Sequence, residues 1–211
     1  MKIYDISEPI SPAIAVFPGD TGFSAEWVMR IENGDSCNVS TLRMSAHLGS
    51  HADAPRHFDS EGGDSASTEL EAYIGPCRVV ELCGHGEPAL LDPAEIDALG
   101  LAGAERVLFR TESGHDASSF DADFTAVGPA AANRLVELGM MLVGIDTPSM
   151  DHAASKELEA HHALYRGGVA ILENLDLSAV EPGDYELIAL PLRIVGGDSS
   201  PVRAILRTAN G

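Results

Sequence analysis

Basic residues are scarce in this chain of 211 residues, which has 13 lysines and arginines against 33 aspartates and glutamates. The formal net charge of −20 repels the phosphates of nucleic acid and the headgroups of anionic membranes, which argues against partners of both kinds. The acidic residues are spread along the chain, so we interpret them as a solvated surface rather than as a functional patch.

Long apolar runs are also lacking. No segment approaches the ~20 apolar residues that a membrane-spanning helix needs. The N-terminus reaches Asp5 and Glu8 before an apolar run can form, which is unlike a signal peptide. We therefore expect a soluble, cytoplasmic protein, and the length of 211 residues predicts a single domain spanning 1–211.

Cysteine is rare as well, with three in the chain at Cys37, Cys77 and Cys83. None forms a Cys-x-x-Cys pair and the number is odd, so the sequence indicates neither a disulfide framework nor a zinc knuckle. We expect all three to be reduced and buried.

Short β-rich segments dominate the first quarter of the chain, and β and α patterns alternate after it. Helices are expected from Asp92-Pro93, where an aspartate cap precedes a first-turn proline, over 129–138, and over 155–166 with Ser155 as the cap. Together with the strands, this pattern predicts an α/β fold with a mixed sheet. The expected strands are 2–6, 23–31, 38–44, 76–82, 106–111, 140–145, 169–173, 185–192 and 202–207.

The most informative segment is HLGSHADAPRHF at 47–58, which gathers His47, His51, Asp53 and His57 within eleven residues. A glycine and a proline inside it argue against a continuous helix, so we expect an extended or looped segment. In an extended chain, the even separations of four, two and four residues place side chains on one face.

These residue types are typical metal ligands. Neutral imidazole and carboxylate oxygen bind Zn²⁺ or Mn²⁺, and a carboxylate can bridge two ions whereas an imidazole cannot. Asp53 is therefore the natural bridge. A lone histidine is more often a structural residue held by hydrogen bonds, but the density of this cluster favours a metal site.

A second candidate group consists of His161-His162 in the expected third helix and Glu173 at the end of the strand after it. A helix and the strand that follows it can pack side by side. Helical spacing gives each histidine a different face, so the residues alone leave open which of the two is a ligand. Glu173 taken alone fits an exposed strand end as well as it fits a ligand.

The segment at 47–58 resembles the His-x-Gly-Thr-His-x-Asp-x-Pro-x-His signature of the metal-dependent cyclase-like hydrolases, with Ser50 in place of the threonine. This family includes bacterial kynurenine formamidases and isatin hydrolases. The similarity to the kynurenine formamidases continues in VFPGD at 16–20, GPCRVVEL at 75–82, GIDTPSMD at 144–151, AILENLDL at 170–177, GDYELIALPL at 183–192 and SPVRAIL at 200–206.

The resemblance implies a swivelling β/β/α fold, a homodimer, and hydrolysis of N-formyl-L-kynurenine, a small aromatic amide, to L-kynurenine and formate in tryptophan breakdown. It also implies two divalent ions, zinc with manganese as the alternative. The first ion is expected on His47, His51, Asp53 and Glu173, and the second on Asp53, His161 and Glu173.

In the same resemblance His57 is the catalytic acid/base, and it suits this role because it lies near the ligands without completing either set. An ion of this kind lowers the pKa of a bound water to ~7, so no serine nucleophile is needed. This agrees with the lack of a Gly-x-Ser-x-Gly elbow in the sequence.

The residue before Pro18 contacts the substrate in that family and is commonly tryptophan, whereas this chain has Phe17. The departure bears on the substrate more than on the reaction. An isatin hydrolase or another amide-cleaving member would keep the metals and change the pocket. A non-catalytic metal-binding protein would bind zinc without turnover and would leave His57 without a role.

Overall fold

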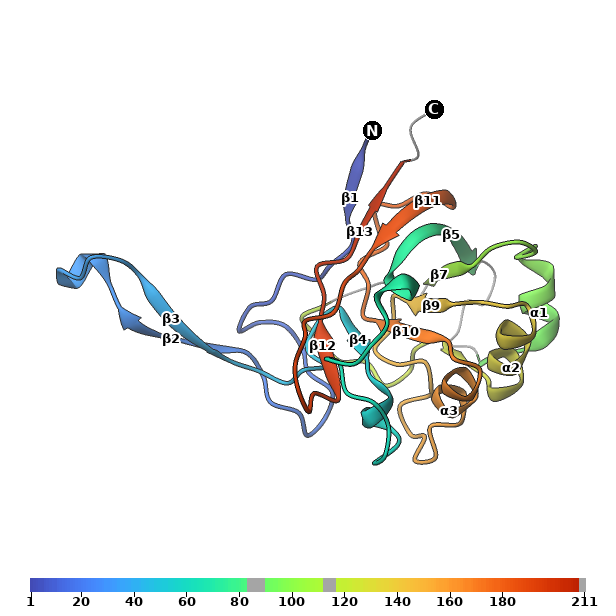
Figure 1. Ribbon diagram of the computed structural model, residues 1–211, viewed down its shortest axis with the longest axis horizontal. Helices are drawn as coiled ribbons and strands as arrows, with labels where there is room; N and C mark the ends of the chain where they lie inside the picture. The colour runs from blue at the N-terminus through green and yellow to red at the C-terminus, as the bar shows by residue number, and fades with distance from the viewer. Residues whose placement is uncertain (83–89, 112–116, 209–211) are drawn as a thin grey trace.

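A curled mixed sheet of nine strands forms the centre of the fold (Figure 1). The computed structural model describes residues 1–82, 90–111 and 117–208. In spatial order the strands are β1 (Ile3–Asp5), β13 (Ile205–Arg207), β11 (Gly183–Ile188), β5 (Ile74–Leu82), β7 (Arg106–Thr111), β9 (Leu142–Ile145), β10 (Ala170–Glu173), β4 (His51–Asp53) and β12 (Ser199–Pro201).

Parallel pairing in this sheet is confined to its middle, where β5, β7, β9 and β10 are neighbours. Parallel neighbours need crossover connections, and these hold helices α1 (Pro93–Ala98), α2 (Pro129–Glu137) and α3 (Glu159–Arg166). None of the helices in the described ranges has the length and apolar character needed to cross a bilayer. The smaller elements are the parallel pair β6 (Leu90–Leu91) and β8 (Ala126–Val127), and the 3₁₀ helices η1 (Ile31–Asn33), η2 (Pro55–His57) and η3 (Leu70–Tyr73).

Successive side chains of the central strands point to opposite faces of the sheet, so the core has two layers. On β7, Val107 and Phe109 pack with apolar residues of the three helices, whereas Leu108 between them packs in the cluster on the opposite face. All three side chains are fully buried, and burying each contributes roughly 1.5–3 kcal/mol. Because both faces of the parallel strands are covered, these strands read in the sequence as continuous apolar runs.

A hairpin of β2 (Ser24–Met29) and β3 (Val39–Arg43) extends away from the sheet (Figure 1). Leu42 pairs with Ala25, and Trp27 lies two residues further along on the same face, whereas Glu26 pairs with Thr41 on the other face. Trp27 and Leu42 are 52% and 58% exposed. The hairpin therefore presents an apolar face that the described part of this chain leaves open to solvent.

The predicted α/β class with a mixed sheet is confirmed, and so is the start of α1. Asp92 caps that helix through a reciprocal capping box with Glu95, and Pro93 occupies the first turn. The start predicted for α3 is wrong, because the helix begins at Glu159 rather than Ser155. Ser155 lies before the helix, where its Oγ accepts a hydrogen bond from the amide of Leu158 at 3.2 Å.

The end of the chain also departs from the prediction. The strand expected from 202 begins at Ile205, and the separate edge strand β12 precedes it. A three-residue strand that ends in proline gives little strand signal in a sequence. The cysteine prediction is wrong in part: Cys77 is buried and free, but Cys37 is exposed, while Cys83 lies outside the described residues.

Candidate metal centre

Strand β4 carries two of the predicted site residues. His51 and Asp53 are two residues apart, so their side chains leave the strand on the same face. Glu173, the last residue of β10, is the cross-strand partner of His51. The three residues are 2%, 6% and 4% exposed, so the sheet brings three ligand-type side chains to one buried position.

Helix α3 adds His161 to this group. His161 is 1% exposed, and its Nε2 lies 3.1 Å from Oε1 of Glu173 and 3.4 Å from Oδ2 of Asp53. His162 instead contacts the ring of Phe58, with 5.7 Å between ring centroids. The structure therefore brings His161 rather than His162 to the cluster, a choice that the residues alone left open.

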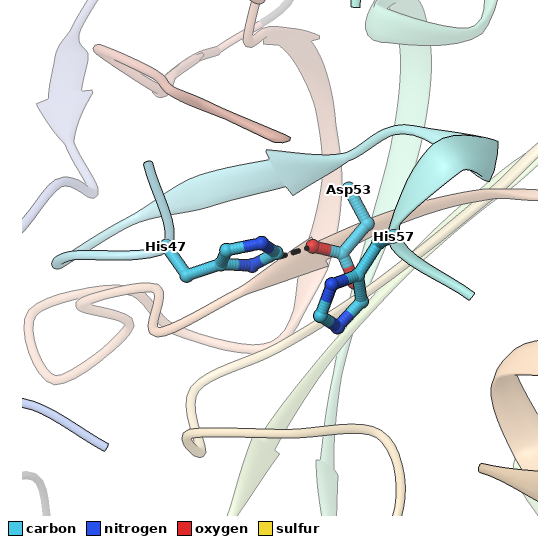
Figure 2. Close-up of side chains that lie close together, drawn as sticks. All are labelled: His47, Asp53 and His57. Carbon is cyan, nitrogen blue, oxygen red and sulfur yellow. Dashed lines mark ion pairs between the residues drawn. The ribbon is translucent and has the colours of Figure 1, made fainter. Parts of the chain in front are cut away.

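His47 and His51 approach the same two carboxylates from the other side. Nδ1 of His47 lies 3.1 Å from Oδ1 of Asp53, a contact that Figure 2 shows with His57 beside it. Nε2 of His51 lies 3.5 Å from Oδ1 of Asp53 and 3.3 Å from Oε2 of Glu173. The donors thus form two groups, because each carboxylate turns one oxygen toward His51 and the other toward His161.

These contacts are close, but several of the atoms involved still lack a hydrogen-bond partner. Nε2 of His51, Nε2 of His161 and both carboxylate oxygens of Asp53 have no hydrogen-bond partner among the described residues. Burying charged groups in this way costs several kcal/mol for each charge. Donors bound at ~2.0–2.1 Å to one tetrahedral ion lie ~3.3–3.4 Å apart, which matches the observed 3.1–3.5 Å. The residues present therefore fit a divalent cation.

The outward ring nitrogens of the two most buried histidines are hydrogen-bonded. Nδ1 of His51 donates to the carbonyl of Gly49 at 2.8 Å, and Nδ1 of His161 donates to Oδ2 of Asp151 at 2.6 Å. We assign the protons from this geometry, since neither acceptor can donate in return. When these rings are neutral, as metal binding requires, the lone pair of each Nε2 points at the carboxylates.

The carboxylates and histidines shift one another's ionisation. Burial alone would raise the pKa of Asp53, but the adjacent His161 and His47 outweigh it and hold that pKa well below its ordinary value. For His47, burial acts to lower the pKa, but the neighbouring carboxylates of Asp53, Glu173 and Asp198 outweigh it and raise the pKa to about 9. Oδ2 of Asp198 lies 3.2 Å from Nε2 of His47. In the metal-free protein, imidazolium protons therefore supply the positive charge that balances the carboxylates.

His57 lies at the end of η2, beside this cluster. Its ring centroid is 4.2 Å from that of His47 and 6.1 Å from that of His161. His57, His47 and Asp53 offer donor atoms within 4.8 Å of one another, so His57 is within reach of a ligand position. Desolvation lowers the pKa of His57 below 6.5, more than the Asp53 charge raises it, so the ring is neutral at neutral pH.

The cluster opens into a cavity of about 640 Å³, which is within the range of small-molecule sites. Phe17 lies on its wall and is 40% exposed. The ring of Phe17 packs edge-on against Phe120, with 5.1 Å between centroids and 71° between the ring planes. Two aromatic rings beside a polar cluster suit a small aromatic ligand.

Three residues at the site, Asp151, Asp198 and Phe120, have no sequence signal that marks them as site residues. Asp151 follows a strand inside the motif GIDTPSMD, and Asp198 lies in a Gly-Gly-Asp turn, where aspartate is common for local reasons. Phe120 follows a stretch with no element signal. Only spatial contacts distinguish these three residues from others of their type.

Comparison with known proteins identifies the family. Residues 4–152 match the model of the Cyclase family. The chain is 45% identical over 206 residues to the kynurenine formamidase of Maricaulis maris (strain MCS10), covering 98% of both proteins. It is 46% identical over 209 residues to the kynurenine formamidase of Paracidovorax citrulli (strain AAC00-1), covering 98% of this chain and 96% of the relative.

Solved structures agree with this result. A protein described as a potential metal-dependent hydrolase with cyclase activity superposes with a TM-score of 0.83 at 28% identity, covering 97% of this chain and 96% of that one. Isatin hydrolase A from Labrenzia aggregata, bound to benzyl benzoate, also gives a TM-score of 0.83, at 25% identity, covering 99% and 94%. The resemblance seen in the sequence is thus confirmed, and this chain belongs to the cyclase family of metal-dependent hydrolases.

Proposed function

We propose that this protein hydrolyses N-formyl-L-kynurenine to L-kynurenine and formate at a divalent metal centre held by His47, His51, Asp53, His161 and Glu173. The main support is the convergence of these five donors at an aromatic-walled cavity. The chain around them is 45% identical, over nearly its full length, to a kynurenine formamidase.

The contacts of the carboxylate oxygens favour two ions per chain. Asp53 and Glu173 each turn one oxygen to His51 and the other to His161, so both can bridge. Zinc prefers this mixture of imidazole and carboxylate donors, and manganese is the alternative. Such ions, when bound, polarise a carbonyl oxygen and lower the pKa of water at the site to ~7.

His57 is placed to move the protons of the reaction. It lines the cavity, and the five other donors already supply both groups. Because its lowered pKa keeps the ring neutral at neutral pH, it can accept a proton from the attacking water. It can then donate that proton to the arylamine nitrogen as the formamide C–N bond breaks.

The cavity wall fits an aromatic substrate that also carries an ammonium group. The paired rings of Phe17 and Phe120 can enclose an aryl ring. Asp20, Asp121 and Asp123 also line the cavity, and none of the described lining residues is a lysine or arginine. These aspartates can form an ion pair with the α-ammonium group of the zwitterionic N-formylkynurenine.

Hydrolysis of isatin is the second candidate, because isatin hydrolase A shares the fold. That reaction would use the same metal centre, so the cavity has to discriminate between the two substrates. Isatin is uncharged and has no ammonium group, so the acidic lining offers it no ion pair. A metal-binding protein without activity is the remaining rival.

The deciding experiment measures hydrolysis of N-formyl-L-kynurenine and isatin by the purified protein, with its metal content determined in parallel. We expect turnover of the first substrate at a higher kcat/KM and loss of activity on chelation, with recovery on adding zinc. Preference for isatin would replace the substrate assignment. Bound zinc without turnover of either substrate would contradict an enzyme of this kind.

We also propose that the protein is a homodimer and that the β2–β3 hairpin contributes to its interface. An isolated two-stranded hairpin is marginally stable in water, and this one exposes Trp27 and Leu42 on one face. A second copy of the chain would cover that face.

We further propose that the chain forms a single domain and that it is located in the cytoplasm. A single domain over 1–211 is supported by the pairing of β1 with β13, because strands from the two ends of the chain are neighbours in one sheet. Subcellular fractionation would test the cytoplasmic location.

A further inference from the structure

Asp151 is a buried carboxylate, 6% exposed, in the segment between β9 and α3. Three donors converge on it. Its Oδ1 accepts from the amide of Ala160 at 3.0 Å, and its Oδ2 accepts from the amide of His161 at 3.0 Å and from Nδ1 of His161 at 2.6 Å. One side chain therefore holds both the backbone and the ring of a proposed metal ligand.

The two backbone contacts take the place of a local helix cap. Leu158, at the N-cap position of α3, has a left-handed φ of 45° and provides no side-chain cap. The first-turn amides that a cap would normally bind are satisfied instead by Asp151, nine residues before Ala160. The position of α3, and hence the direction of His161, depends on this carboxylate.

The ring contact determines which nitrogen of His161 carries the proton. Because Oδ2 of Asp151 accepts from Nδ1–H, the neutral ring keeps its proton on Nδ1, and its lone pair is then on Nε2, 3.1 Å from Glu173 and 3.4 Å from Asp53. In the opposite tautomer an N–H group would occupy the ligand position and exclude an ion.

We propose that Asp151 is a positioning residue of the metal centre, which fixes the tautomer and orientation of His161 so that Nε2 can bind an ion. This inference rests on the metal centre of the proposed function. Asp151 does not line the cavity, so it acts on the reaction through the residues that it holds at the start of α3, His161 among them.

The test compares zinc binding by the wild-type protein, Asp151→Ala, Asp151→Asn and the control Ser155→Ala. The control removes the Oγ that accepts from the Leu158 amide, so it loosens the same helix start without touching His161. Zinc stoichiometry comes from elemental analysis, affinity from competition with a chromophoric chelator, and the protonated nitrogen of His161 from ¹⁵N NMR of the zinc-loaded proteins.

We expect Asp151→Ala to bind one of its two ions about 10- to 100-fold more weakly, as is typical when an outer partner of a ligating histidine is lost. Asp151→Asn should lose less affinity, because one side-chain oxygen can still accept a hydrogen bond. Ser155→Ala should match the wild type, and the wild-type spectrum should show the proton on Nδ1.

Wild-type zinc affinity for both ions in the two Asp151 variants would overturn the inference. So would an equal loss in Ser155→Ala, because Asp151 would then act only on helix stability. If Asp151→Ala does not fold, Asp151→Asn decides by the same criterion. A wild-type protein that binds two zinc ions without cleaving N-formylkynurenine removes the proposed function and leaves this inference intact, whereas one that binds no zinc overturns both.

Discussion

Glu173 and His51 are cross-strand partners in the antiparallel pair β10–β4, and Oε2 of Glu173 lies 3.3 Å from Nε2 of His51. Segments that are distant in the sequence thus place an imidazole and a carboxylate together on rigid, buried backbone. Directly opposed side chains on paired strands have little freedom to separate. Metal binding at a site built in this way should respond to substitutions of its own donors and tolerate changes elsewhere on the cavity wall.

The substitution Asp53→Asn should weaken the binding of both ions at once. Oδ1 of Asp53 faces His47 and His51 while Oδ2 faces His161, so removal of its charge affects both donor groups. Removing one charge from a buried charge cluster costs about 3–5 kcal/mol, which corresponds to roughly 10²- to 5 × 10³-fold in affinity. Elemental analysis should give two ions in the wild type and fewer in the variant.

Asp20→Asn provides the matched control. Asp20 lines the same cavity but contacts Ser45 rather than the donor cluster, so its variant should keep both ions. A fully active wild-type preparation with one ion or none would refute the two-ion centre.

The substitution His57→Ala should keep most of the metal and lower kcat by about 10²- to 10⁴-fold, the usual range for loss of general acid/base transfer. The lowered pKa of His57 gives a second signature. A base is active only when neutral, so wild-type activity should fall as the pH drops through a value below 6.5. Loss of zinc in proportion to activity would make His57 a ligand, which its closeness to His47 and Asp53 allows.

Metal binding should release protons and strengthen as the pH rises toward 9. In the metal-free protein the pKa of His47 is raised to about 9, and that of His161 also lies well above 6.5, so both are protonated at pH 7. An ion must displace those protons, and its apparent affinity should rise about tenfold per pH unit for each proton displaced. Calorimetry in buffers of different ionisation enthalpy would count the protons.

The same shift predicts how the stability of the metal-free protein varies with pH. The folded pKa of His47 lies above the ordinary 6.5, so its contribution to stability is fully present below 6.5 and is lost as the pH rises through about 9. Chemical unfolding of the chelated protein across this range would measure the loss. If neither the metal affinity nor the stability of the metal-free protein changes between pH 6 and 10, the protonated state assigned to His47 is contradicted.

The substitution Phe17→Ala should lower kcat/KM for N-formyl-L-kynurenine by about tenfold, since it removes roughly 1–2 kcal/mol of aromatic contact. Phe17→Trp should preserve or improve it, because a larger ring can pack on Phe120 and on the substrate. Kinetics of the three proteins on N-formylkynurenine and isatin make the comparison. Indifference to Phe17→Ala would argue against this residue as a substrate contact.

The substitution Leu42→Asp should convert a dimer into monomers. It places a charge on the apolar face that Leu42 shares with Ala25 and Trp27. Thr41→Asp is the control, because it adds the same charge to the same strand on the opposite face. Light scattering coupled to size exclusion should show a dimer for the wild type and for Thr41→Asp. A monomeric wild type would rule out the homodimer, and a dimeric Leu42→Asp would place its interface elsewhere.

The segment from His47 to His57 was informative in the sequence because its geometry is local. His51 and Asp53 face the same way whenever the chain is extended, and strand β4 makes it extended. The residue types alone indicated metal chemistry, and Asp92-Pro93 marked the start of α1 for an equally local reason, the capping of the first-turn amides.

Tertiary structure decided what depended on contacts between distant segments. The choice of His161 over His162 followed from the rotation of α3 against β10, and the position of Glu173 followed from the pairing of β10 with β4. The predicted helix start at Ser155 is wrong because the amides at the true start of α3 are capped by Asp151, from outside the local sequence. Local sequence records backbone propensity and side-chain period, whereas sheet register, helix rotation and remote caps are determined by packing, so only the folded chain reveals them.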